Sequence, residues 1–149
     1  MADLHLIDFY KDTAQALLSL HQSFPRKVEL YVEDLIGEDH VDEFGLHSKR
    51  HEACLGAFLW LAEEGYIRYH STIRQEAIDQ AILSSKTVVL LGTISTTQFS
   101  PEDHSQEAPS FEAQERITMI EHIRRALRSK SSDQLTQVMK TFFEMGHQC

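Results

Sequence analysis

The spacing of apolar residues changes at Gly65 from a helical pattern to a strand-like alternation, and this change constrains the fold more than any other feature. Before Gly65, apolar residues recur at spacings of three and four, which predicts a helix over about residues 48–64 with one buried face. Ser48 can cap the start of that helix, and glycine is the common left-handed residue at a helix end. The predicted inward side chains are Cys54, Leu55, Phe58, Leu59, Leu61 and Ala62. Apolar and polar residues then alternate over 66–70, so the helix is expected to pass directly into a half-buried strand.

Two segments around this helix and strand leave a choice open. Residues 71–77 are polar and typical of a turn, and residues 77–83 can return as the second strand of a hairpin, although their alanines and acids also fit a helix. Residues 28–32 suit either a short strand or the start of a helix. Residues 39–44 predict a further short helix before a turn at Gly45.

A first helix is predicted to begin after a cap at Asp3 and to end near Gln22. Its apolar positions recur at helical spacing and are Leu6, Ile7, Tyr10, Ala14, Leu17 and Leu18. Pro25 disfavours helical geometry at Phe24, so the helix should stop before that pair.

The C-terminal part of the chain predicts three helices and a linker. The serines at 84–85 can cap a helix that runs to Gly92. Residues 93–110 contain Ser, Thr, Gln, Glu and two prolines with little periodicity, which is typical of a linker. Two amphipathic helices are predicted beyond it, one over 111–128 and one that includes 135–143.

Together these elements predict an α+β fold that is mainly α with a small β-hairpin. The expected organisation is an N-terminal helix and a helix-hairpin module in residues 1–92, the linker 93–110, and a C-terminal helical extension in residues 111–149 that serves dimerisation.

Residues 58–70, FLWLAEEGYIRYH, resemble the end of the recognition helix as it enters the wing of winged helix-turn-helix proteins. In that superfamily the helix closes with a leucine, two polar residues, a glycine, an aromatic residue and an isoleucine, and a hairpin follows. Residues 83–91 resemble the leucine-threonine-x-lysine-glycine step that follows the wing in many bacterial members, with Thr87 at the glycine position. The resemblance covers about residues 28–92 and implies a winged-helix core. It also implies a third helix in the DNA major groove, although many members bind proteins instead.

Charge and composition limit the possible partners. The 149 residues carry a net charge of −9, of which residues 1–47 contribute −7, with ten acids and three bases. Phosphate attraction supplies most non-specific nucleic-acid affinity, so this charge argues against general coating of nucleic acid but allows a local basic face. We expect a cytoplasmic protein without membrane contact, because the chain has no apolar run of about 20 residues and no basic and apolar leader. Cys54 and Cys149 are expected to be reduced thiols.

If the module binds double-stranded DNA, the N-terminal part of the 48–64 helix is expected to contact the bases. The predicted residues there are Ser48, Lys49, Arg50 and His51. Those predicted to contact phosphates from the wing are Arg68, His70 and Arg74. Arg50 suits a guanine and Lys49 suits a phosphate. In the alternative interpretation these are ordinary solvated charges, and Glu52 has the wrong sign to face phosphates.

The histidines and nucleophiles form no established motif. Glu43, His47 and His51 can converge if the helix begins early enough to place the histidines one turn apart, but Gly45 and Ser48 interrupt such a helix. His-Glu-x-x-His order and paired cysteines are missing from the sequence, so we expect no bound metal.

Two other possible reaction centres are also set aside. Cys54 lies on the predicted buried side of its helix, where a thiol is a poor nucleophile. Residues 84–87 lack the flanking glycines of a phosphate loop. We therefore expect no cofactor and no enzymatic activity.

The C-terminal helices carry apolar stripes that two short helices cannot bury by themselves. The residues concerned are Ile117, Ile120, Ile123, Leu127, Phe142 and Phe143. A second copy of the chain or the first helix of the same chain can cover them, and a homodimer is the simpler hypothesis. The sequence thus favours a non-enzymatic, dimeric winged-helix protein that binds DNA or regulates transcription. The alternative is a winged-helix adaptor that binds a protein partner and no nucleic acid.

Overall fold

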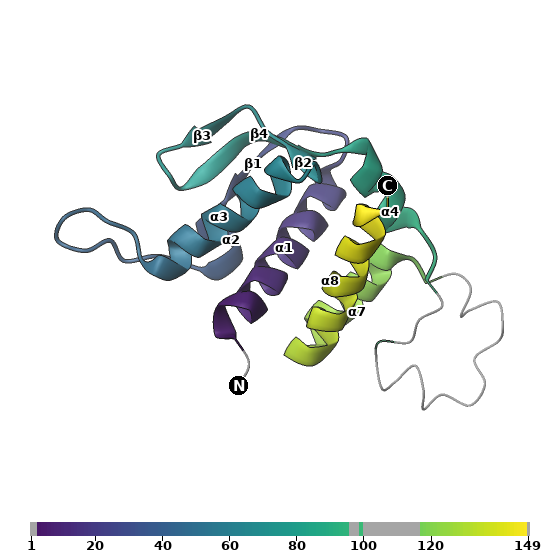
Figure 1. Ribbon diagram of the computed structural model, residues 1–149. Coiled ribbons are helices and arrows are strands. Elements are labelled where there is room, and N and C mark those ends of the chain that lie inside the picture. The colour runs from purple at the N-terminus through teal and green to yellow at the C-terminus, as the bar shows by residue number, and fades with distance from the viewer. Residues whose placement is uncertain (1–2, 96–98, 100–116, 149) are drawn as a thin grey trace. The chain divides into compact units, whose positions relative to one another are not determined.

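The computed structural model describes residues 3–95, 99 and 117–148. Within them the chain is a mixed α+β protein with a small antiparallel sheet (Figure 1). It divides into two units, Met1–Ser84 and Ser85–Cys149. Among the described residues, each helix is too short or too polar to span a bilayer.

The first unit alternates helices and short strands. In chain order they are α1 (Leu4–Ser23), β1 (Val28–Tyr31), α2 (Val32–Ile36), α3 (Lys49–Glu63), β2 (Ile67–Arg68), β3 (Ser71–Ile73) and β4 (Ala77–Leu83). Helix α1 packs against α3 and against strands β1 and β4. It ends just before Phe24 and Pro25, as predicted.

The predicted change from helix to strand at Gly65 is confirmed. Gly65 has φ +83°, the left-handed conformation that glycine adopts without strain. Its N–H donates to the carbonyl of Ala62, and the N–H of Tyr66 donates to the carbonyl of Leu61 at 2.8 Å. These two bonds form a Schellman motif, which satisfies the last carbonyls of α3 and turns the chain into β2.

Strand β4 lies at the centre of the sheet. The order is β1-β4-β2, and β3 also pairs with β4, all antiparallel. Thr72 lies opposite Ile78 on one side of β4, and Leu30 lies opposite Ile78 on the other. Residues 77–83 are therefore a strand, and the hairpin predicted after Gly65 is present. Pairing on both sides of β4 outweighs the helical preference of its two alanines.

Two other segments, residues 28–32 and 39–44, differ in how well their predicted structure agrees with the observed one. Residues 28–32 satisfy both alternatives, because the strand β1 ends at Tyr31 and α2 begins at Val32. The short helix predicted over 39–44 is wrong. A carboxylate oxygen of Asp42 accepts from the N–H groups of Phe44 and Leu46, each at 2.9 Å, and Gly45 has φ +77°. These local bonds close a tight turn in place of a helix.

The core of the first unit lies between its helices and the sheet. Its largest fully buried side chains are Leu17, Leu20, Phe58, Leu61, Ile67, Ile78 and Leu83. On α1 the predicted positions Ala14 and Leu17 are buried, whereas Leu6 is exposed. The same helix also buries Asp12 and Thr13, which the apolar pattern did not predict.

The second unit contains α4 (Ser85–Gly92), α7 (Met119–Ser129) and α8 (Ser132–His147), which pack against one another. Thr118 and Ser131 cap α7 and α8 through their side-chain oxygens. Helix α4 belongs to this unit, so the first unit ends at Ser84, before the boundary predicted at residue 92.

The linker region is described only at its ends. Ile94 and Thr118 form an antiparallel bridge that brings these ends together. Helix α7 starts after its cap at Thr118, later than the predicted start at residue 111, because Thr118 has an extended backbone. The rest of the predicted linker, apart from Phe99, and residues 111–116 lie outside the described residues.

Candidate functional site

The four residues at the N-terminal end of α3 that were predicted to contact bases differ in their exposure to solvent. The hydroxyl oxygen of Ser48 caps the helix by accepting from the N–H of His51 at 3.1 Å. Ser48 and Lys49 are exposed, whereas Arg50 is half-buried and His51 is only 1% exposed. Only the first two are therefore presented to solvent.

Arg50 is held by carboxylates of α1. Its two terminal nitrogens donate to the two oxygens of Asp12, both at 2.6 Å, and its Nε lies 3.6 Å from Asp8. Asp12 is 1% exposed, so this bidentate pair compensates a buried charge. The pair links α1 to α3. Because both terminal nitrogens of Arg50 donate to Asp12, they are engaged within the chain and are not available for the predicted contact with guanine.

The hairpin of residues 67–83, which contains β2, β3 and β4, carries the other predicted cations. Arg68, His70 and Arg74 are all exposed. Arg74 and Gln75 both have positive φ, 49° and 62°, and the N–H of Glu76 donates to the carbonyl of Ile73 at 2.7 Å, so the hairpin tip is a β-turn with both central residues left-handed. Arg74 is therefore an exposed residue of the hairpin tip.

The exposed surfaces of the hairpin and of α3 differ in charge. The exposed side chains of the hairpin, residues 67–83, are Arg68, His70, Ser71, Thr72, Arg74, Gln75 and Gln80, all basic or neutral. Its two acids, Glu76 and Asp79, are half-buried. The exposed residues of α3 are Lys49, Glu52, Ala53, Gly56 and Glu63, with one base against two acids. The positive surface therefore lies on the hairpin.

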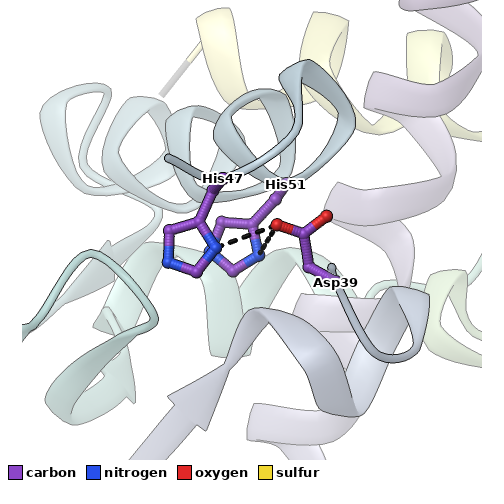
Figure 2. Close-up of side chains that lie close together, drawn as sticks. All are labelled: Asp39, His47 and His51. Atoms are coloured by element: carbon purple, nitrogen blue, oxygen red, sulfur yellow. Dashed lines mark hydrogen bonds and ion pairs between the residues drawn. The ribbon is translucent and has the colours of Figure 1, made fainter. Parts of the chain in front are cut away.

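A second polar cluster lies beside the cap of α3 and contains Asp39, His47 and His51 (Figure 2). Oδ2 of Asp39 is 2.9 Å from Nδ1 of His47 and 3.7 Å from Nδ1 of His51. The two imidazole rings are stacked, with centroids 3.8 Å apart and planes 5° from parallel. Three segments thus converge: the loop after α2, the residue before the cap, and the first turn of α3.

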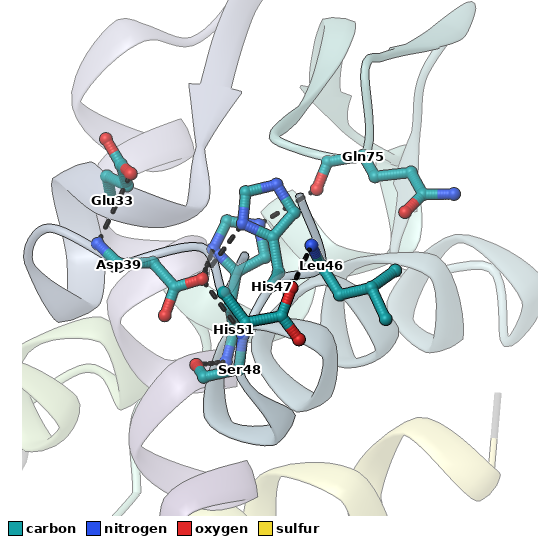
Figure 3. A network of polar contacts seen from close by, with 8 residues as sticks. Glu33, Asp39, Leu46, His47, Ser48, His51 and Gln75 are labelled. Carbon is teal, nitrogen blue, oxygen red and sulfur yellow. Dashed lines mark hydrogen bonds and ion pairs between the residues drawn. The ribbon is translucent and has the colours of Figure 1, made fainter. Parts of the chain in front are cut away.

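Further hydrogen bonds position this cluster (Figure 3). The backbone N–H of Ser48 donates to Oδ2 of Asp39 at 3.0 Å, and the N–H of Asp39 donates to Glu33 at 3.3 Å. Nε2 of His51 donates to the carbonyl of Gln75, in the hairpin turn, at 2.9 Å. The hydrogen bonds from Ser48, together with that from His47, lower the pKa of Asp39 to about 2, so this carboxylate is ionised at neutral pH.

The cluster corresponds in part to a prediction from the sequence. His47 and His51 do converge, but through ring stacking across the cap, since the helix begins only at Lys49. Asp39 takes the place expected for Glu43, which is exposed and lies outside the group. Asp39 was missed because residues 39–44 were predicted to be helical.

The two sites set aside on the sequence, the thiol of Cys54 and the 84–87 segment, have defined surroundings in the structure. Burial raises the pKa of Cys54 to about 12, so its thiol is protonated at neutral pH. The hydroxyl of Ser84 donates to the carbonyl of Gly65 at 2.7 Å and of Tyr66 at 3.0 Å, next to the end of α3.

The apolar residues predicted for a dimer interface are largely covered within one chain. Ile120, Ile123 and Phe142 are at most 5% exposed, and Ile117, Leu127 and Phe143 are half-buried. Packing of α4, α7 and α8 against one another covers the first three. The other alternative drawn from the sequence, packing against the first helix, stays a prediction. The arginines of α7 also have a local partner, because Arg124, Arg125 and Arg128 surround Glu121.

Comparisons of the chain with protein families, with curated proteins and with solved structures found no match. Proposals about function are therefore drawn from the geometry of its own residues.

Proposed function

We propose that this protein is a winged-helix protein that binds double-stranded DNA, with the hairpin of residues 67–83 as its wing and main contact. The arrangement of the first unit supports this proposal. Its elements follow the order helix, strand, helix, helix and hairpin, and the first strand pairs with the last strand of the hairpin. This is the topology expected of a winged helix.

The observation that carries the proposal is the composition of the exposed hairpin surface. Arginine, serine, threonine and glutamine side chains are those that commonly contact DNA phosphates, and the exposed hairpin residues are of these types together with one histidine. Arg68 and Arg74 supply the positive charge. An acidic chain can bind DNA through such a local basic face, because screening confines the effect of distant acids.

The start of α3 adds a weaker contact. Lys49 is exposed in the first turn, and the helix N-terminus carries a partial positive charge that favours a phosphate. Glu52 and Glu63 make the rest of the exposed helix face unfavourable for DNA. The proposed contact is therefore mostly with the backbone and has little base reading, which predicts modest sequence preference.

The test is titration of a random duplex at several salt concentrations, with the double variant Arg68→Ala/Arg74→Ala. Loss of two phosphate contacts should weaken binding and reduce the salt slope by about 1.8, since each contact contributes about 0.9. The matched control, Lys11→Ala/Lys140→Ala, removes the same charge from exposed positions outside the hairpin and α3. Absence of salt-dependent binding by the unmodified protein, or equal losses in both double variants, would overturn the proposal.

A protein-binding adaptor is the second candidate, and the loop between α2 and α3 favours it. This loop presents Val41, Phe44 and Leu46 to solvent, with 51%, 79% and 60% of their surfaces exposed. Exposed apolar side chains close together commonly mark protein contacts. If DNA binding is absent, this loop is the first place to seek a partner. Self-association through the half-buried residues of α7 and α8 also stays a prediction.

A further inference from the structure

The cluster of Asp39, His47 and His51 contains donor atoms arranged as in a metal site. One ligand atom from each residue, Oδ2 or Nδ1, lies within 4.8 Å of the others. We propose that these three residues bind one divalent transition-metal ion, with Zn²⁺ as the preferred ion. This proposal goes beyond DNA or protein binding and depends on neither.

The strongest support is an unsatisfied atom on His51. The carbonyl of Gln75 can only accept a hydrogen bond, so Nε2 of His51 carries a hydrogen, and the tautomer that has its hydrogen on Nε2 has a lone pair on Nδ1. The residue is 1% exposed, and this Nδ1 has no hydrogen-bond partner among the described residues. Its nearest carboxylate oxygen, at 3.7 Å, is too distant for a hydrogen bond and is itself an acceptor. A buried lone pair that faces an anion is costly unless a cation lies between them.

The surroundings of His51 match those of a metal-binding histidine. Such residues almost always donate their other ring nitrogen to a carbonyl or carboxylate, which fixes the tautomer and aims the lone pair at the ion. The bond from Nε2 of His51 to Gln75 does this. The bond from the N–H of Ser48 to Asp39 holds the carboxylate in the same way.

The spacing of the donor atoms also fits. Zinc lies about 2.0–2.2 Å from nitrogen and oxygen ligands, so two ligands of a tetrahedral ion are separated by about 3.4 Å. The separations from Oδ2 of Asp39 are 2.9 Å and 3.7 Å. Two imidazoles and one carboxylate form a ligand set that zinc commonly uses, and they leave the fourth position open for water or another molecule.

Binding requires one rearrangement. The ion must lie near the plane of each imidazole, whereas the two rings are now stacked and almost parallel. His51 is fixed by α3 and by Gln75, so His47, which precedes the helix, is the ring that tilts. The hydrogen that His47 shares with Asp39 moves from Nδ1, and the ring then ligates as the Nε2–H tautomer.

A bound ion would join parts of the chain that are now held by single hydrogen bonds. It would close the loop from Asp39 to His47, which carries the exposed apolar residues, onto the first turn of α3. Through His51 and Gln75, the same ion would be linked to the hairpin turn. Metal occupancy should therefore order this loop and protect it from proteolysis.

The test is titration of metal-free full-length protein with Zn²⁺ against a chromophoric chelator, with Co²⁺ absorption as the second readout. The background variant is Cys149→Ser, which removes a thiol able to bind zinc independently. Asp39→Asn retains an oxygen for the N–H of Ser48, and His47→Gln changes a loop residue, so both variants are expected to fold. The control His40→Gln alters an exposed histidine of the same loop.

One ion per chain is expected, with visible Co²⁺ absorption typical of tetrahedral coordination. Each ligand variant should lose more than the roughly 10–100-fold in affinity that removal of an outer-shell partner costs, while His40→Gln binds as the background protein does. Zinc should also slow cleavage of the 39–47 loop in the background protein and in His40→Gln, but not in the two ligand variants. The proposal is overturned if the background protein does not bind zinc, or if both ligand variants bind as tightly as the control.

Discussion

The start of α3 and the tip of the hairpin both carry arginines, but the two regions use them in opposite ways. Arg50 forms a bidentate pair with the buried Asp12, whereas Arg74 projects into solvent from a turn. Arginine therefore stabilises the packing of two helices in one region and presents its positive charge to solvent in the other. Burial of the partner, and not the sequence position of the arginine, separates the two roles.

The largest difference between α3 and the hairpin tip is expected in the rate at which a cysteine thiol in each region reacts with an alkylating reagent. Cys54 lies one turn after Arg50 in α3, is fully buried and has a pKa raised to about 12. In a Cys149→Ser background, alkylation of Cys54 at neutral pH should require unfolding and be slower by about a thousandfold or more than alkylation of Arg74→Cys at the hairpin tip. Mass spectrometry of time points measures both rates. Similar rates would mean that the α3 region opens as readily as the hairpin.

The pH dependence of Cys54 has a definite sign. Its pKa in the folded protein lies above the ordinary value of 9.0, so the folded state retains the thiol proton longer than the unfolded state does. Its contribution to stability is complete below about pH 9 and is lost as the pH rises toward 12. Cys54→Ala should therefore flatten the decline in stability over this alkaline range.

The next largest difference is in the free energy of unfolding. Arg50→Ala leaves Asp12 buried without its partner and should lower stability by about 3 kcal/mol, as urea unfolding measures. Lys49→Ala, at the adjacent exposed position, should change it by less than about 0.5 kcal/mol. The double variant Arg50→Met/Asp12→Leu should recover most of the loss, because it removes both charges together. Equal stability of the Arg50 and Lys49 variants would contradict the structural role of the pair.

This expectation also limits what Arg50 can reveal about DNA. A loss of DNA binding by Arg50→Ala would follow from damage to the α1–α3 contact as readily as from a lost base contact. Variants of the hairpin arginines avoid this ambiguity, since both side chains are exposed.

The smallest effect is expected at the hairpin turn and has the opposite sign. Gln75 has φ +62°, a conformation that costs residues other than glycine about 1 kcal/mol. Gln75→Gly should therefore stabilise the protein by up to about 1 kcal/mol, and its carbonyl remains available to His51. Thermal and urea unfolding measure the gain, with exposed Gln80, at φ +55°, as a second position for the same change. A loss of stability in Gln75→Gly would show that the turn is not strained, whereas Gln80→Gly tests a position within β4.

Much of the secondary structure was predictable because it depends on neighbours in the chain. The Schellman motif at Gly65 and the cap at Ser48 are both satisfied within a few residues, so the residue types alone indicated them. The prediction of a helix over 39–44 was wrong, also because of a local interaction. The side chain of Asp42 accepts hydrogen bonds from nearby backbone N–H groups and forms a turn in place of a helix. Residues 28–32 were ambiguous because two elements meet there.

The candidate sites were less predictable. His47 and His51 were identified as a pair, but Asp39 joins them only because the path of the preceding loop brings it back to the cap of α3. The free lone pair on His51 depends on the carbonyl of Gln75, which lies 24 residues further along the chain. The partner of Arg50 is 38 residues away, on another helix.

The sequence by itself determined where α1 and α3 begin and end, where the chain turns into the hairpin, and which side of α3 is apolar. Those features depend on hydrogen bonds and spacing within one or two turns of the backbone. The tertiary structure alone decided that the hairpin arginines are exposed while Arg50 is paired, and that Asp12 is buried. It also decided that Asp39, His47 and His51 lie together. A charge or a lone pair is stabilised by whatever lies next to it in space, and the residues that lie there come from distant parts of the chain.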